Sequence, residues 1–195
     1  MLELTIAKSE LILGGQKSGK SRRAELLART WLAQSPQHRA TLIATAQPWD
    51  AEMRERIARH QRERAERVPG LQTVEEPLRL AEAIAAHSRP ETLLVVDCLT
   101  LWLTNLLMPA ENSMSNQASE LEAQASIAML LGAIRTAAGP VVLVGNEIGL
   151  GVIPLGREVR AFVDALGRLN QDVAQACTRV TLMAAGLPLT LKGGA

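Results

Sequence analysis

Residues 10–21 read ELILGGQKSGKS, an apolar run followed by a glycine-rich turn. The apolar run is typical of a short buried strand, and the turn ends it. From residue 14 the stretch matches the pattern G-x-x-x-x-G-K-[ST], with Gly14, Gly19, Lys20 and Ser21 at the fixed positions. A helix is predicted directly after the turn, because apolar residues then recur at helical spacing. Strand, turn and helix in this order are the context that a phosphate-binding loop needs.

The residues of this loop have the chemistry that phosphate binding requires. Its glycines let the backbone curl so that successive N–H groups point at phosphate oxygens, and the helix adds its positive N-terminal end. We expect Lys20 to reach the β- and γ-phosphates of a nucleotide and Ser21 to offer its hydroxyl to Mg²⁺. The alternative is a glycine-rich turn without a ligand, which the agreement of motif and context disfavours. The predicted nucleotide-binding loop consists of Gly14, Gly15, Gln16, Lys17, Ser18, Gly19, Lys20 and Ser21.

Short apolar runs alternate with amphipathic stretches along the rest of the chain. The pattern predicts strands at 10–13, 40–45, 71–74, 93–96, 141–144, 180–183 and 189–191, and helices at 20–32, 50–67, 77–87, 118–138 and 155–178. Asp50 is expected to cap the second helix and Pro77 to open the third, while residues 109–117 form a surface loop. The alternation indicates βαβ units. The predicted fold class is α/β: a single P-loop NTPase domain over residues 1–195, with a mostly parallel sheet, helices on both faces and a C-terminal antiparallel hairpin.

An acidic residue, Asp97, follows the apolar run at residues 93–96. It is expected at the carboxyl edge of a strand, where open α/β sheets bind ligands. There it resembles a Walker B acid, so Ser21 and Asp97 are the predicted Mg²⁺ ligands. The alternative is that Asp97 caps the next helix. Residues 146–149 lack the Lys and Asp of an N-K-x-D guanine motif, so a small-molecule transferase is favoured over a guanine-nucleotide switch.

The predicted helix at 50–67 is strongly charged and carries a histidine. Met53, Ile57, His60 and Arg64 are spaced by four, three and four residues, so they share one face. A histidine beside arginines on such a face suits a phosphate site. The alternative is a solvated helix held by ion pairs four residues apart, with a structural histidine.

A glycine-rich loop at residues 145–151 is expected at the same sheet edge as the phosphate-binding loop. Its glycines favour close backbone approach to a ligand, although an ordinary connecting loop is the alternative. Arg157 and Arg160 follow it and could reach anionic groups of a substrate. Asn170 and Gln171 fit either a site or contacts between helix and sheet.

Charge and composition exclude several classes of protein. The chain has 21 basic and 20 acidic residues and 2% aromatic residues. It therefore has neither the large positive net charge that attracts nucleic acid nor the aromatic rings on which bases stack. The richest apolar stretch, residues 93–107, is too short and too interrupted for stable membrane insertion. Cys98 and Cys177 form no metal motif and no disulfide framework. The N-terminal residues do not resemble a signal peptide, so a soluble, reduced, cytoplasmic protein is expected.

The order of these motifs resembles that of the bifunctional adenosylcobinamide kinase/adenosylcobinamide-phosphate guanylyltransferases of cobalamin synthesis. The likeness covers nearly the whole chain. Its most specific part combines Asn-Glu-x-Gly-x-Gly-x-x-Pro at residues 146–154 with the Arg-Ile-x-x-His spacing that ends at His60. The other segments that carry it are the phosphate-binding loop with residues 22–25, then 44–47, 52–53, Arg64, Glu75, 97–100, 105–106, Arg160, Asp164, Gly167, 170–171 and Gly186.

The resemblance implies two reactions. The first phosphorylates the aminopropanol hydroxyl of adenosylcobinamide with ATP or GTP, and the second transfers GMP from GTP to that phosphate, giving adenosylcobinamide-GDP. The guanylylated histidine of the family corresponds to His60, so His60 and Lys20 are the predicted catalytic residues. The further nucleotide contacts that the resemblance implies are Ala44, Thr45, Ala46, Gln61, Arg62, Glu63, Arg64, Glu75 and Asp97. It also implies nucleotide and corrinoid substrates, Mg²⁺, and a homo-oligomer, a trimer in known members.

Some positions depart from the family pattern. Ala46 stands where many members have Ser, Ala65 where Pro often follows the arginine, and Asp97 where some members have Glu. None of these positions is the proposed nucleophile, and Asp97 stays one candidate base for the acceptor hydroxyl. Two other functions fit the motifs without the resemblance. One is a P-loop kinase of another small alcohol without a covalent intermediate, and the other is an NTP-dependent switch that transfers nothing.

Overall fold

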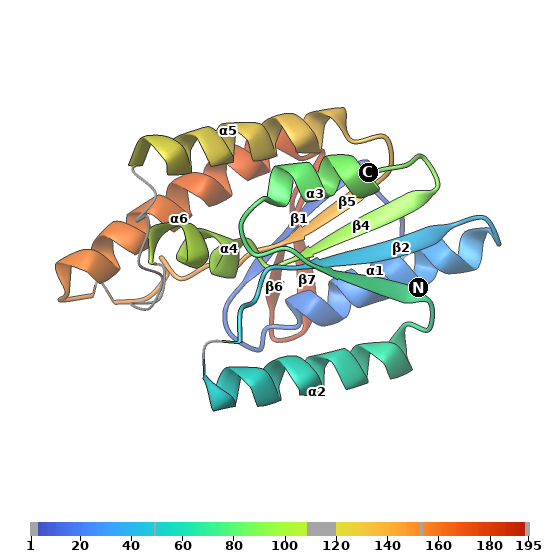
Figure 1. The fold of residues 1–195 in the computed structure, drawn as a ribbon, viewed down its shortest axis with the longest axis horizontal. Coiled ribbons are helices and arrows are strands. Elements are labelled where there is room, and N and C mark those ends of the chain that lie inside the picture. Colours follow the sequence, from blue (N-terminus) through green and yellow to red (C-terminus); the bar gives the residue numbers. More distant parts are fainter. Residues whose placement is uncertain (1–3, 49, 109–119, 153, 194–195) are drawn as a thin grey trace.

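A seven-stranded sheet forms the centre of the molecule, with strand order β3-β2-β4-β5-β1-β6-β7 (Figure 1). The computed structural model describes residues 4–48, 50–108, 120–152 and 154–193. The strands are β1 Ser9–Gly14, β2 Arg39–Ala44, β3 Leu71–Glu75, β4 Thr92–Asp97, β5 Val141–Val144, β6 Arg179–Ala184 and β7 Leu187–Lys192. All neighbouring strands pair in parallel except β7, which runs antiparallel to β6. The predicted parallel sheet and C-terminal hairpin are confirmed.

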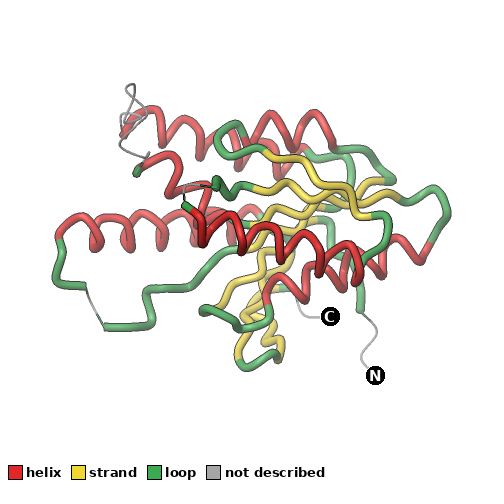
Figure 2. The backbone as a smooth tube through the Cα atoms, turned by 60° about the horizontal axis from the view of Figure 1, so that its bottom comes forward, coloured by secondary structure: helices red, strands yellow, loops and turns green. Residues whose placement is uncertain are grey.

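Helices cover both faces of this sheet, as predicted (Figures 1 and 2). They are α1 Lys20–Gln34, α2 Ala51–Arg67, α3 Leu80–His87, α4 Leu99–Leu107, α5 Glu120–Thr136 and α6 Arg157–Ala176. Buried side chains of α3, α4, α5 and α6 form one core with one face of the sheet. Those of α1 form a second core with the other face. Residues 99–107, which the sequence pattern leaves unassigned, form α4.

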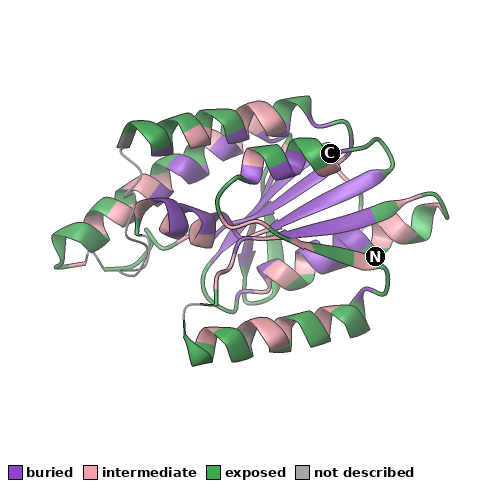
Figure 3. Cartoon of the chain, viewed as in Figure 1, coloured by how far each residue is buried: buried purple, intermediate pink, exposed green. Residues whose placement is uncertain are grey.

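The central strands are buried on both faces, which explains their unbroken apolar runs (Figure 3). In β4, Leu94 and Val96 point into the core under α3–α6, while Leu93 and Val95 point into the core under α1. Side chains alternate across a strand, so both sets must be apolar. The edge strand β7 has no such cover, and all its residues are exposed.

Five predicted helix boundaries differ from the observed ones by two or three residues: the ends of α1, α5 and α6 and the starts of α3 and α6. Helix α3 begins at Leu80 and not at Pro77, because Glu76 Oε1 accepts the backbone N–H groups of Leu78 and Arg79, at 3.0 and 2.8 Å, and holds a turn before the helix. Helix α6 begins at Arg157, two residues after its predicted start. The predicted loop at 109–117 and the first residues of the predicted helix at 118–138 lie outside the described residues.

From the carboxyl ends of the neighbouring strands β1 and β5, the chain continues to opposite faces of the sheet. These neighbouring strands are parallel, but β1 continues into α1 on one face and β5 leads to α6 on the other. In open α/β sheets such a switch point opens the crevice in which ligands bind. Asp97 lies at the same edge, because it pairs with Val144, which in turn pairs with Ile12 of β1.

Candidate active site

The loop after β1 has the backbone geometry that its glycines predict. Gly14 has φ = 152°, and a Cβ there would lie 2.5 Å from the carbonyl oxygen of Met183 and 2.6 Å from Ser18 Oγ. Gly19 has φ = 101°, a left-handed conformation at the start of α1. Larger side chains at these two positions would be strained or would clash. The loop therefore needs both glycines for its curled shape.

Lys20 folds back over this loop. Its Nζ donates to the carbonyl oxygen of Gly15 at 2.6 Å, and the residue is buried. Burial lowers the pKa of Lys20, and the nearby Cys98 and Asp97 partly offset that effect. A buried cation at the mouth of a phosphate-binding loop attracts phosphate strongly, since little solvent screens it. The role of Lys20 on the phosphates of a nucleotide stays a prediction.

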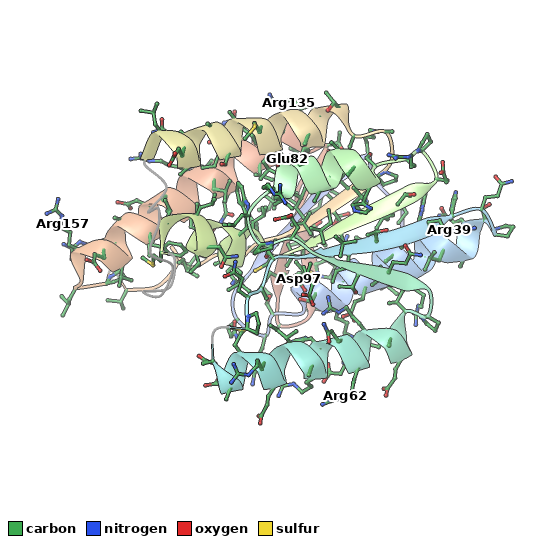
Figure 4. All side chains as sticks on the ribbon, in the orientation of Figure 1. Arg39, Arg62, Glu82, Asp97, Arg135 and Arg157 are labelled. Atoms are coloured by element: carbon green, nitrogen blue, oxygen red, sulfur yellow. The ribbon has the colours of Figure 1, made fainter. Side chains whose placement is uncertain are left out.

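Asp97 ends β4, half-buried, near the middle of the molecule (Figure 4). Cys98 and not Asp97 is the N-cap of α4, and no side chain caps that helix. The alternative that Asp97 caps a helix is therefore wrong.

Ser21, the other predicted metal ligand, lies in the first turn of α1 and is half-buried. No group of three or more His, Cys, Asp and Glu side chains forms a metal site within the described residues. A single carboxylate and a hydroxyl still suit Mg²⁺, which takes few protein ligands beside phosphate oxygens and water.

Helix α2 carries His60 on the predicted face. Met53, Ile57, His60 and Arg64 are all half-buried, and none of the described side chains of α2 is fully buried. Asp50 caps the helix as predicted, since its Oδ1 accepts the N–H of Met53 at 2.7 Å. The helix that carries His60 therefore packs only weakly against the rest of the protein. The half-buried His60 is accessible to a ligand.

The C-terminal end of α2 is fastened to α1. Arg67 lies 3.2 Å from Glu25 of α1 and 2.9 Å from Glu63. Glu63, a predicted nucleotide contact, is therefore paired within the protein. Gln61 and Arg62 are exposed, and Figure 4 shows Arg62 directed away from the sheet.

A hydrogen-bond network joins the loops after β2, β3 and β4. Thr45 is fully buried, and its Oγ1 donates to the carbonyl oxygen of Cys98 at 2.7 Å and accepts the N–H of Cys98 at 2.9 Å. Asn105 of α4 donates to the carbonyl oxygens of Thr45 at 2.8 Å and Pro77 at 3.0 Å. The resemblance includes Asn105 without a role, and periodicity alone marks it only as a polar interruption. The structure shows that it supports this edge of the site.

The same edge brings several predicted nucleotide contacts together. Ala44 pairs with Glu75 of β3 on one side and with Asp97 on the other. Ala46 is half-buried and Glu75 is exposed. Segments that lie more than fifty residues apart in the sequence thus form one surface beside Asp97.

The loop after β5 is fixed against the phosphate-binding loop. The N–H groups of Gly145 and Glu147 donate to the carbonyl oxygens of Ile12 and Gly14, both at 3.0 Å. Asn170 of α6 donates to the carbonyl oxygen of Asn146 at 3.1 Å, so it is a contact between helix and loop. The two loops therefore form one unit.

The two arginines near the start of α6 are not brought to this unit. Arg160 donates to the carbonyl oxygen of Pro154 at 3.0 Å and holds the start of its own helix. Arg157 is exposed and lies far from Asp97, at the outer end of α6 (Figure 4). The expectation that they reach substrate has no support in this arrangement.

The fold and the site together define a P-loop α/β protein, in which one strand separates the strand of the phosphate-binding loop from the strand of the acid. Residues 10–191 match the sequence profile of CobU, "Cobinamide kinase / cobinamide phosphate guanyltransferase", and the chain belongs to this family. No described helix combines the length and apolar character that crossing a bilayer requires.

Curated relatives agree with this assignment over nearly their whole length. The "Bifunctional adenosylcobalamin biosynthesis protein CobP" of Pseudomonas aeruginosa is 47% identical over 185 residues, which is 94% of this chain and 97% of the relative. The CobU proteins of Escherichia coli and Salmonella typhimurium, which carry the same description, are 37% and 35% identical, each over 93% of this chain and 98% of the relative. Kinase and guanyltransferase activity in cobalamin biosynthesis is thus the function of the family.

Proposed function

We propose that the chain phosphorylates adenosylcobinamide with ATP or GTP and then transfers GMP from GTP to adenosylcobinamide phosphate through a guanylylated His60. The observation that carries the proposal is the convergence of the phosphate-binding loop, Lys20 and Asp97 at one switch point of the sheet. The half-buried His60 on α2 supplies a nucleophile that a plain kinase would not need.

In the kinase step the loop N–H groups and Lys20 hold the triphosphate. The acceptor oxygen forms a bond to the γ-phosphorus while the bond from that phosphorus to the bridging oxygen breaks, and a nucleoside diphosphate leaves. Lys20 stabilises the charge that develops on the phosphate oxygens. Ser21 and Asp97 would hold Mg²⁺, which neutralises phosphate charge when bound.

In the guanylyl step a neutral ring nitrogen of His60 attacks the α-phosphorus of GTP, and pyrophosphate leaves. An oxygen of the acceptor phosphate then attacks the same phosphorus and releases His60. Imidazole suits both halves, because much of it is neutral near pH 7 and it becomes a good leaving group. We assign the remaining nucleotide contacts to residues 44–46, Gln61, Arg64, Glu75 and Asp97. Arg62, which is directed away from the sheet, and Glu63, which is paired with Arg67, are left out of this assignment.

We also propose a cytoplasmic homo-oligomer, a trimer by resemblance. Both cysteines are free and buried, in agreement with a reducing compartment. Leu187, Leu189 and Leu191 of the edge strand β7 are each more than half exposed, and such an apolar edge favours association with another subunit.

Mass spectrometry after incubation with GTP tests the covalent step. We expect a GMP adduct on the wild type, mapped to His60, and none on His60→Asn, because an amide cannot form a stable phosphoramidate. His87→Asn is the control and keeps the adduct. Phosphorylation of adenosylcobinamide persists in His60→Asn, since it needs no covalent intermediate. An adduct on His38 or His87 would refute the assignment, and no adduct on the wild type would favour a simple kinase.

A further inference from the structure

A pocket of about 400 Å³ lies beside the phosphate-binding loop. Its walls come from three segments that are distant in sequence: residues 15–18 of the loop, Glu147 and Leu150 after β5, and residues 182–185 at the turn between β6 and β7. None of the predicted nucleotide contacts outside the loop lines it. The pocket therefore offers space for a second ligand next to the nucleotide.

The walls of this pocket are fastened to one another. The N–H of Glu147 donates to the carbonyl oxygen of Gly14, and the N–H of Gly186 donates to that of Ser18, both at 3.0 Å. At Gly19 an added Cβ would lie only 3.3 Å from the Cα of Gly186. Because backbone hydrogen bonds hold all three segments, the pocket is already formed without a ligand.

The pocket adjoins the part of the loop that Lys20 contacts. Gly15 lines it, and the carbonyl oxygen of Gly15 is also the partner of Lys20 Nζ at 2.6 Å. Lys20 is the side chain expected on the β- and γ-phosphates. A ligand in the pocket would thus adjoin the phosphoryl group that is transferred.

The described residues that line the pocket include one acid, Glu147, and one base, Lys17. Its Oε1 accepts the N–H of Gly149 at 2.8 Å, which orients the carboxylate. A carboxylate at this position can accept the proton of a neutral hydroxyl. Leu150, Leu182 and Met183 add apolar surface that suits the hydrocarbon around such a hydroxyl.

We propose that this pocket receives the alcohol end of the corrinoid acceptor and that Glu147 is the general base of the kinase step. The inference rests on the proposed function. The acceptor O–H bond breaks and its proton moves to a Glu147 oxygen, while the acceptor oxygen bonds to the γ-phosphorus and the nucleoside diphosphate leaves. The proton then passes from Glu147 to solvent. Asp97 serves as a metal ligand in this scheme and not as the base.

Glu147→Gln separates the base from every other role of the site. We expect the kinase kcat to fall by about 100-fold, the usual contribution of a general base, with the nucleotide KM within about threefold. The GMP adduct on His60 forms at the normal rate, because that step deprotonates no hydroxyl. Guanylyl transfer to pre-formed adenosylcobinamide phosphate is also retained. Glu147→Asp recovers part of the lost rate, and Glu82→Gln, an exposed change on α3, has no effect (Figure 4).

A second variant tests the pocket itself. Leu150 is 82% exposed, so Leu150→Ala leaves the fold intact but removes apolar surface from the pocket. We expect a higher KM for adenosylcobinamide in the kinase step and an unchanged KM for the nucleotide. Leu121→Ala, 79% exposed on α5, is the matched control.

The outcomes are distinguishable. A kinase rate in Glu147→Gln within about threefold of the wild type would overturn the base, as would an equal loss of kinase and adduct formation, which indicates a damaged phosphate-binding loop. An unchanged KM for adenosylcobinamide in Leu150→Ala would contradict the proposal that the acceptor binds in this pocket. If the wild type phosphorylates no corrinoid but forms the GMP adduct, the proposed kinase function itself fails.

Discussion

Lys20 is a charged side chain that the fold buries. Apart from Gly15, the potential partner of its Nζ is Ser18 Oγ at 3.5 Å, a long contact. Burial that lowers its pKa means that the folded protein gains little from this charge. A buried cation that contacts no carboxylate among the described residues is therefore explained better by binding of phosphate than by stability.

Lys20→Met tests that explanation. We expect both the kinase and the guanylyl-transfer rates to fall by about tenfold or more, because one preorganised cation on the phosphates is lost. The melting temperature stays equal or rises, since an apolar chain of similar length replaces a buried charge. Steady-state rates and thermal unfolding measure the two effects. Near-normal rates for both reactions would contradict the role of Lys20.

At the scale of secondary structure, α2 differs from the other described helices because its described side chains include no fully buried one. Packing contributes little to such a helix, so caps and ion pairs matter more. The Asp50 cap and the Arg67 ion pairs hold its two ends. The position of His60 thus depends on local interactions at both ends of α2.

Asp50→Ala removes the N-terminal cap, which contributes about 1 kcal/mol. We expect amide hydrogen exchange over residues 51–60 to accelerate and formation of the GMP adduct on His60 to slow by about fivefold, the factor that corresponds to that free energy. In Asp50→Asn, amide hydrogen exchange and the rate of adduct formation stay near the wild-type values, since Asn caps a helix as well as Asp does. If amide hydrogen exchange over residues 51–60 were as slow in Asp50→Ala as in the wild type, the cap would not be what holds α2.

Helix α4 acts on the site through Asn105. Asn105→Leu leaves the buried carbonyl oxygens of Thr45 and Pro77 without this donor. We expect the free energy of unfolding to fall by about 2 to 4 kcal/mol and the KM for GTP to rise, because unpaired buried polar groups are costly and residues 44–46 lose their support. Urea unfolding and guanylyl-transfer kinetics measure both. The exposed change Gln124→Leu on α5 is the control, and equal stability of the two variants would contradict the prediction.

The whole molecule has two cores, one on each face of the sheet, and each contains one thiol. Cys177 belongs to the core under α3–α6 and Cys98 to the core under α1. Burial raises the pKa of Cys98 from 9.0 to about 11 and that of Cys177 from 9.0 to about 12. Both thiols are therefore protonated in the folded protein at neutral pH.

These shifts predict how stability depends on pH. A raised pKa means that the folded state binds the thiol proton more tightly than the unfolded state does. The stability gained from this proton is therefore complete below pH 9 and is lost as the pH rises toward 11 to 12. We expect each thiol to lower the free energy of unfolding by about 1.4 kcal/mol per pH unit in this window. Urea unfolding of wild type and Cys98→Ala at about pH 8 and about pH 10.5 checks this, and the variant loses less stability. Equal losses would contradict the prediction.

Local patterns were sufficient for much of the fold and for part of the site. The phosphate-binding loop, the α/β class, the buried strands, the hairpin and the face of α2 that carries His60 all follow from spacing over a few residues. They are predictable because backbone conformation and amphipathicity depend on near neighbours. The start of α3 was not predictable in this way, since a side chain, Glu76, competes with Pro77 for the first turn.

The sequence by itself determined that a phosphate-binding loop follows the first strand of a parallel sheet, because that motif lies within eight consecutive residues. Only the tertiary structure decided that Asp97 does not cap α4, that Asn105 joins two loops, and that Glu147 faces the phosphate-binding loop. Glu147 lies more than a hundred residues from Gly14, yet its N–H binds the carbonyl oxygen of Gly14. Such contacts depend on the order of strands in the sheet, which hydrophobic periodicity does not encode.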